Sequence, residues 1–162
     1  MGAEVQKAPS ILLIEDSEGD VELIKQLLGN VIAEKDIHVA SSGEDALHFL
    51  HKSAQFAGSP DVDIIIMDLN LPRKSGYEVL AEIKQDERLR RTPVIVLTGS
   101  VADKDIDKAY ELGANCYVVK PVMFKELAKA VELIDQFWLR TAALPHRPSK
   151  NKENPYTSHG KE

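Results

Sequence analysis

Five short apolar segments alternate with longer amphipathic segments along the chain. The apolar segments are four residues long and mostly rich in β-branched side chains, which is typical of strands buried in a parallel sheet. We predict strands at 11–14, 37–40, 64–67, 94–97 and 116–119, of which the second is the weakest.

The segments between these runs space their apolar residues as helices that pack by one face do. Ser17 and Ser42 are suitable N-caps for two of them. Ser75, with Glu78 three residues later, forms a capping-box pattern for the third. The remaining two helices are predicted at 103–112 and 124–138.

Five strand–helix units predict an α/β fold, with one parallel sheet covered by helices on both faces. Right-handed crossovers and the strand order 2-1-3-4-5 would give a flavodoxin-like, doubly wound domain with five helices. We expect this domain to span 10–140, after a flexible N-terminus at 1–9. The extension at 141–162 is rich in Pro, Asn, Ser and Lys, so we expect it to be mostly disordered.

Composition excludes several classes of protein. No apolar run approaches the roughly 18 residues that a membrane span needs, and residues 1–10 contain no core of a signal peptide. The single cysteine, Cys116, permits no internal disulfide, which fits a reducing compartment. The net charge of −6 argues against non-specific nucleic-acid binding. We therefore expect a cytoplasmic protein with neither membrane nor nucleic acid as partner.

Chemically distinctive side chains follow four of the predicted strands. Because the carboxyl ends of parallel strands meet at one edge, where ligands bind in open α/β sheets, we expect these side chains to gather there. They are Glu15 and Asp16, Asp68, Thr98 with Gly99, and Lys120.

Three neighbouring carboxylates repel one another, and an oxygen-rich site of this kind suits a hard divalent cation such as Mg²⁺. The alternative is a solvated acidic strand end. Lys120 either forms a plain salt bridge or awaits an anion that arrives with the metal, and Thr98 and the Gly99 N–H would add donors. Such a set describes a phosphoryl site in which Asp68 is the nucleophile and an acyl phosphate is the product.

These motifs, in this order, resemble those of the receiver domain of two-component response regulators, over about residues 10–138. Those that carry the resemblance are Glu15-Asp16, Asp68-Leu69-Asn70-Leu71-Pro72 with Gly76, Thr98-Gly99 and Lys120-Pro121. The resemblance implies that Asp68 accepts a phosphoryl group from a histidine kinase. It implies a metal site in which Asp16 and Asp68 bind directly, the Asn70 carbonyl helps, and Glu15 acts nearby or through water. It also implies phosphoryl contacts from Asn70, Gly99 and Lys120, catalytic roles for Lys120 and Thr98, and a switch pair of Thr98 and Tyr117.

A narrower resemblance concerns 70–74, 114–117 and 137–139. These segments are similar to those of the single-domain regulators that are paired with bacterial and cyanobacterial phytochrome kinases. A phytochrome-type histidine kinase is therefore the expected partner.

The last predicted helix has more apolar residues than one face needs. Leu127, Val131, Ile134 and Trp138 suit the core, whereas Ala130, Leu133 and Phe137 form an adjacent stripe. The stripe either widens a single buried face or, together with 139–145, forms a homodimer contact.

Three functions compete. The first is a phosphorylated switch without separate substrate turnover, which signals through an unknown downstream partner or a relay. The second is a phosphatase or phosphotransferase with an Asp nucleophile, but such enzymes usually carry a second Asp two residues later, where this chain has Asn70. The third is an adaptor that works without phosphorylation, which the intact Asp16, Asp68, Thr98 and Lys120 disfavour.

Overall fold

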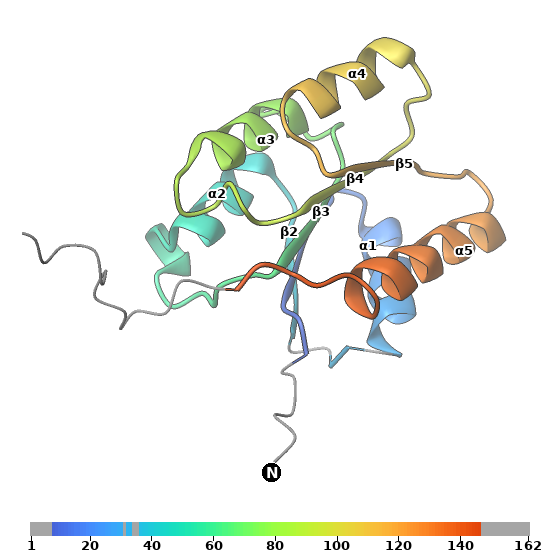
Figure 1. Cartoon of the computed structure of the whole chain (residues 1–162), viewed down its shortest axis with the longest axis horizontal. Coiled ribbons are helices and arrows are strands. Elements are labelled where there is room, and N and C mark those ends of the chain that lie inside the picture. Colours follow the sequence, from blue (N-terminus) through green and yellow to red (C-terminus); the bar gives the residue numbers. More distant parts are fainter. Residues whose placement is uncertain (1–7, 31, 34–35, 147–162) are drawn as a thin grey trace, which may run out of the picture.

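One five-stranded parallel sheet in the order β2-β1-β3-β4-β5 organises the molecule (Figure 1). The computed structural model describes residues 8–30, 32–33 and 36–146. The strands are β1 (Ile11–Ile14), β2 (Ile37–Ala40), β3 (Ile64–Met67), β4 (Val94–Thr98) and β5 (Cys116–Val119). The predicted fold class and strand order are confirmed. The predicted flexible N-terminus and disordered extension lie largely outside the described residues and stay predictions.

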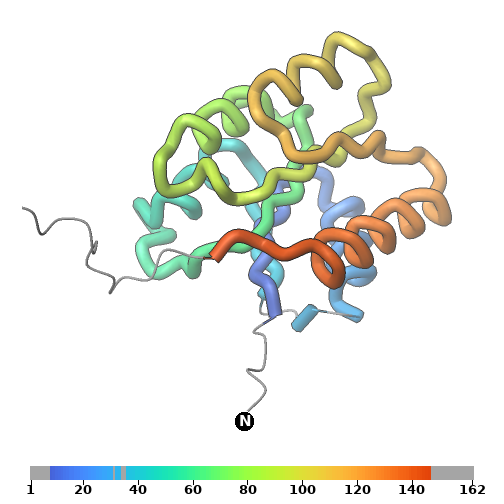
Figure 2. The backbone as a smooth tube through the Cα atoms, viewed as in Figure 1, coloured from blue at the N-terminus to red at the C-terminus, as the bar shows by residue number. Residues whose placement is uncertain are grey.

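Two helices cover one face of the sheet and three cover the other (Figure 1). The helices are α1 (Glu18–Gly29), α2 (Gly43–His51), α3 (Gly76–Gln85), α4 (Asp103–Glu111) and α5 (Phe124–Ile134), with a 3₁₀ turn η2 (Ala54–Phe56) and a π-helical turn η3 (Asp135–Leu139). The trace in Figure 2 shows the chain returning to the sheet after each of α1 to α4. Among the described residues, no helix is long and apolar enough to cross a membrane.

The core consists of two layers because successive strand side chains point to opposite faces. Ile11 and Leu13 pack with α1 and α5, whereas Leu12 and Ile14 pack with α2 and α3. All residues of β1, β3 and β4 are buried. This explains why these strands read as continuous apolar runs rather than as alternating ones.

The predicted helix starts are confirmed. The Ser17 and Ser42 hydroxyls accept hydrogen bonds from backbone N–H groups of their first turns, and Ser75 and Glu78 form the complete capping box. The end of the last helix was predicted wrongly. The α-helix stops at Ile134, and 135–139 form a π turn. Apolar spacing does not distinguish these geometries, since they differ by about one residue per turn.

Candidate functional site

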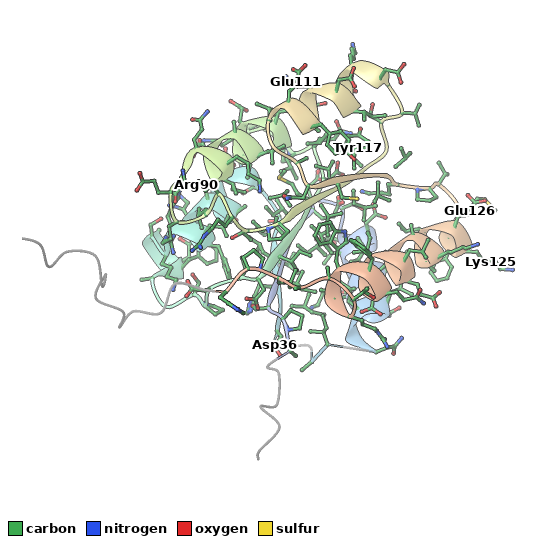
Figure 3. All side chains as sticks on the ribbon, viewed as in Figure 1. Asp36, Arg90, Glu111, Tyr117, Lys125 and Glu126 are labelled. Carbon is green, nitrogen blue, oxygen red and sulfur yellow. The ribbon has the colours of Figure 1, made fainter. Side chains whose placement is uncertain are left out.

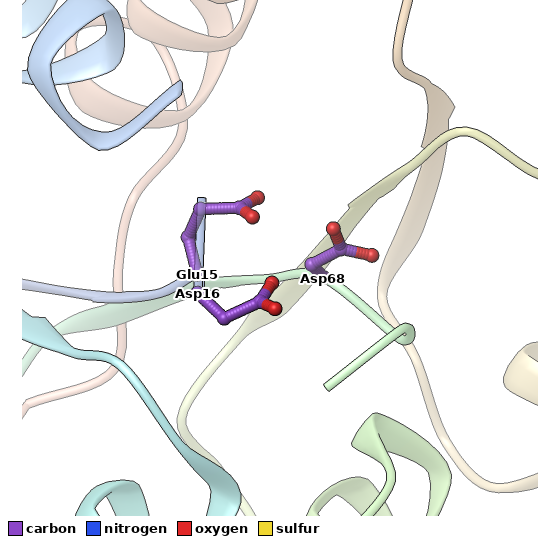
Figure 4. A group of neighbouring side chains, drawn as sticks. All are labelled: Glu15, Asp16 and Asp68. Carbon is purple, nitrogen blue, oxygen red and sulfur yellow. The ribbon is translucent and has the colours of Figure 1, made fainter. Parts of the chain in front are cut away.

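Backbone pairing carries the sheet one residue beyond the strands and fixes where the polar side chains begin. The Asp68 N–H donates to Ile14 O at 2.9 Å, and the Lys120 N–H donates to Thr98 O at 2.7 Å. Figure 4 shows Glu15 and Asp16 at the end of β1 beside Asp68 at the end of β3. Residues distant in sequence thus meet at the carboxyl edge of the sheet.

Asp68 is buried, and both its carboxylate oxygens accept hydrogen bonds. Oδ1 accepts from the Thr98 hydroxyl at 2.7 Å and from the Asn70 N–H at 3.0 Å, and Oδ2 accepts from Lys120 Nζ at 3.0 Å. Burial by itself raises the pKa of Asp68, but these three donors outweigh it, so the pKa lies below its ordinary value. The carboxylate is therefore ionised at neutral pH and available as a nucleophile.

Gly76 explains part of the motif that follows Asp68. A Cβ at this position would lie 2.5 Å from the Asp68 carbonyl oxygen and 2.5 Å from Leu69 Cα. The Gly76 N–H also donates to Leu69 O at 2.9 Å. The start of α3 therefore presses directly against the backbone that carries Asp68, and only glycine fits between them.

Lys120 lies among three carboxylates. Its Nζ is 2.7 Å from Glu15 Oε2, 3.0 Å from Asp20 Oδ2 and 3.0 Å from Asp68 Oδ2, and its side chain is 12% exposed. Burial by itself lowers the pKa of Lys120, but the hydrogen bonds to these acids raise it above its ordinary value. The ammonium is thus a fixed positive charge beside Asp68.

The acidic cluster fits a divalent cation. Ligand oxygens of Glu15, Asp16 and Asp68 all lie within 4.8 Å of one another, with Asp16 exposed and the other two buried. Burial raises the pKa of Glu15 to about 7, against hydrogen bonds from Lys120 and the Ser17 N–H that lower it. Three oxygen donors with one open side are the kind of set that hard cations prefer.

Tyr117, labelled in Figure 3, is the second residue of β5, and its side chain packs against the core cluster on the face that α2, α3 and α4 cover. Its hydroxyl donates to Ser100 O at 2.9 Å, and its N–H donates to the Tyr110 hydroxyl at 3.1 Å. Ser100 lies two residues after Thr98, whose hydroxyl is on Asp68. A short path through the β4–α4 loop therefore joins the carboxylate to the predicted switch tyrosine.

Comparison with known proteins identifies the family of this chain. The model of the response regulator receiver domain matches residues 11–132. The chain belongs to this family. The response regulator Rcp1 of Synechocystis is 41% identical to this receiver over 145 residues, which cover 90% of this chain and 99% of Rcp1.

Two solved structures of response regulators are similar to this chain in fold and sequence. The phosphorylated cyanobacterial phytochrome response regulator RcpA has a TM-score of 0.83 at 39% identity, covering 86% of this chain and all of RcpA. The Mn²⁺-bound form of Rcp1 has a TM-score of 0.79 at 42% identity, covering 85% of this chain and 99% of that one. The predicted identity as a two-component response regulator receiver is confirmed.

The structure brings most of the predicted site residues into direct contact. Thr98, Asn70, Lys120 and Asp68 are joined by hydrogen bonds, and Asn70 Nδ2 also lies 3.5 Å from Thr98 Oγ1. Gly99 follows Thr98 at the surface, and a Cβ there would meet nothing within 4 Å. Its predicted phosphoryl contact stays a prediction.

Sequence reasoning missed Asp20. It lies in the first turn of α1, where an acidic residue is ordinarily explained by the helix dipole. Its position four residues after Asp16 is the only signal in the sequence that one turn of chain returns a fourth carboxylate to the same edge.

Proposed function

We propose that Asp68 accepts a phosphoryl group from a histidine kinase. The observation that supports this most directly is the set of donors on its buried carboxylate, from Thr98, Asn70 and Lys120. A phosphoryl group on Asp68 would have its oxygens near these groups. They would supply the positive charge and the N–H and O–H donors that those oxygens need. No separate substrate turnover is part of this proposal.

In the proposed step, an Asp68 carboxylate oxygen attacks the phosphorus of a phosphohistidine. A P–O bond forms as the P–N bond breaks, and the electron pair returns to the imidazole nitrogen, which takes up a proton. Lys120 holds positive charge near the phosphoryl oxygens, and Thr98 can turn its hydroxyl from Asp68 Oδ1 to one of them.

The proposed resident cation is Mg²⁺, held directly by Asp16, Asp68 and the Asn70 carbonyl, with Glu15 nearby or bound through water. When bound, it offsets negative charge on the phosphoryl oxygens. Support comes from the cluster of carboxylates at this edge and from the Mn²⁺-bound form of Rcp1. Among biological cations, Mg²⁺ suits one or two carboxylates plus waters.

The proposed kinase is of the phytochrome type, because RcpA is a phytochrome response regulator and shares 39% identity with this chain. We place the output at α4 and β5. If the Thr98 hydroxyl leaves Asp68, the conformation of the β4–α4 loop, which holds Tyr117 through Ser100, changes. The surface that a downstream partner would contact then changes as well.

A homodimer through the end of α5 completes the proposal. Leu133 near the end of α5 and Phe137 in the following turn η3 are 56% and 55% exposed. Leu139 and Leu144, which were expected to join the same contact, pack partly against the protein's own core. The proposed dimer contact is therefore limited to the stripe of Ala130, Leu133 and Phe137. Sedimentation at tens of micromolar should give a dimer that Phe137→Glu converts to monomer, whereas Val101→Glu, at another exposed apolar residue, keeps it. A monomeric wild type would contradict this part.

Labelling with radioactive acetyl phosphate tests the acceptor. Wild type should gain label when Mg²⁺ is present, and Asp68→Asn should stay at background. Asp107→Asn, which neutralises an exposed carboxylate of α4, is the matched control and should label as wild type does. Equal labelling of wild type and Asp68→Asn would refute the assignment.

The competing functions predict different results. A phosphatase would release inorganic phosphate from small esters in many turnovers, whereas the proposed switch would not. An adaptor would give no Mg²⁺-dependent response to beryllofluoride, whereas the proposed switch gives one that Asp68→Ala abolishes.

A further inference from the structure

Asp20 is a fourth carboxylate at the site, and neither the acceptor role nor the metal cluster accounts for it. It lies in the first turn of α1, and its N–H donates to the Ser17 hydroxyl at 3.4 Å. Its Oδ2 lies 3.0 Å from Lys120 Nζ across 100 residues of sequence. The side chain is 32% exposed, so it is more solvated than the remaining two partners of the lysine.

The three carboxylates that contact Lys120 would change in different ways during phosphorylation. An ammonium group has three N–H donors, and here each has one partner among Glu15, Asp20 and Asp68. Glu15 and Asp68 also belong to the acidic cluster that fits a cation, and when Asp68 becomes an acyl phosphate its negative charge is replaced by that of the phosphoryl oxygens. Asp20 lies outside that cluster and is not the nucleophile.

We infer that Asp20 is a positioning residue for Lys120. A lysine side chain is a flexible four-carbon stem, and its ammonium is a point charge that must be held in place. Asp20 restrains the ammonium through a carboxylate that takes no part in the reaction, and it keeps one partner for Lys120 when Glu15 and Asp68 turn to the cation and the phosphoryl group. It also ties the first turn of α1 to the start of the β5–α5 loop. This inference rests on the proposed acceptor role of Asp68.

Two simpler roles for Asp20 predict different results. If Asp20 only adds negative charge, its removal lowers the repulsion of an anionic donor, and phosphorylation becomes faster. If the contact is an ordinary half-exposed ion pair, its removal leaves the rate unchanged, because such pairs contribute little. Of the three roles, only positioning of Lys120 predicts that phosphorylation becomes slower when Asp20 is replaced.

The experiment measures the rate at which acetyl phosphate labels the full chain. Asp68 attacks phosphorus, a P–O bond forms, and acetate leaves with the electron pair of the broken P–O bond. Asp20→Asn should slow this rate about tenfold, and Asp20→Glu, which restores the charge, should recover part of the loss. Glu18→Gln removes the same charge from the same turn at an exposed position and should react as wild type does.

A second measurement separates positioning from metal binding. Metal titration of Asp20→Asn should give the wild-type affinity, and its urea unfolding midpoint should stay near that of wild type. An unchanged or faster rate, an equal slowing by Glu18→Gln, or a loss of metal affinity that matches the loss of rate would overturn the inference.

The failure of the positioning role can be told apart from the failure of the acceptor role. If wild type labels and Asp68→Asn does not, the proposed function stands, and an ordinary rate for Asp20→Asn refutes the positioning role alone. If wild type takes no label, both proposals fail.

Discussion

The β3–α3 unit and the α4–β5 unit lie on neighbouring parts of the same sheet but are packed very differently. All four residues of β3 are buried, and α3 buries Gly76, Val79, Leu80 and Ile83. Within Asp103–Glu111, Ala109 is the one buried residue of α4, and β5 is half-buried with Val119 exposed. The proposed acceptor Asp68 therefore extends from the tightly packed unit, and the predicted switch tyrosine from the loosely packed one.

Two contacts between α4 and its surroundings involve charged side chains. The Ser100 hydroxyl donates to Asp105 Oδ2 at 2.5 Å, and Lys108 Nζ lies 4.2 Å from the centre of the Tyr77 ring on α3. Burial and a hydrogen bond with Asp105 raise the pKa of Tyr77 to about 12. Few buried apolar contacts mean a low local free energy of opening. We therefore expect the first unit to hold the site rigidly and the second to move when the proposed site is phosphorylated.

Truncating one isoleucine in each unit should give the largest difference in stability between the two units. Ile83→Ala in α3 empties a fully buried position and should lower the free energy of unfolding by about 2–5 kcal/mol. Ile106→Ala, at a half-buried position of α4, should lower it by about 1 kcal/mol. Urea unfolding of both variants measures the difference, and equal losses would show that the two units are equally well packed.

Paired glycine substitutions test the same contrast at the site. Gly76→Ala forces a Cβ against the Asp68 backbone, so it should cost about 1–3 kcal/mol and slow phosphorylation. Gly99→Ala meets no atom within 4 Å and should change stability by less than about 0.5 kcal/mol. Thermal unfolding and labelling measure both effects. A stable, normally reactive Gly76→Ala would mean that α3 does not press on Asp68.

Tyr117→Phe has a smaller expected effect. It removes the hydrogen bond to Ser100 O and should cost about 1 kcal/mol. Because α4 has few buried contacts besides, its amide hydrogens should exchange faster, while those of α3 keep the wild-type rate. Hydrogen exchange followed by mass spectrometry measures this, and equal acceleration in both helices would contradict the contrast.

The smallest effect concerns pH at the opposite edge of the sheet. Burial lowers the pKa of His38 on β2, whose ring packs 5.3 Å from that of Phe49. A histidine with a lowered folded pKa contributes stability above its ordinary value of 6.5 and loses it as the pH falls through the folded value. NMR titration should therefore place the His38 midpoint below 6.5, and His38→Gln should flatten the slope of stability below that pH. A midpoint above the ordinary value would contradict this.

Much of the fold followed from local pattern. Four-residue apolar runs with β-branched side chains are stable only when both faces are covered, so β1, β3 and β4 were predictable. The Ser17, Ser42 and Ser75 caps were predictable because capping is a contact within one turn. The π turn at 135–139 was not, because it depends on how the end of α5 packs.

Which residues reach the carboxyl edge of the sheet follows from the amino-acid sequence alone. Parallel strands all end on the same side, so Asp16, Asp68, Thr98 and Lys120 had to meet there whatever their partners. Three-dimensional packing settled which atoms pair: the Lys120 ammonium is shared with Asp20, and Tyr117 bonds to Ser100 O. It also settled that α3 is buried where α4 is not. Side-chain pairing over 100 residues depends on where each element lies in space, whereas strand ends and helix caps depend only on chain direction and near neighbours.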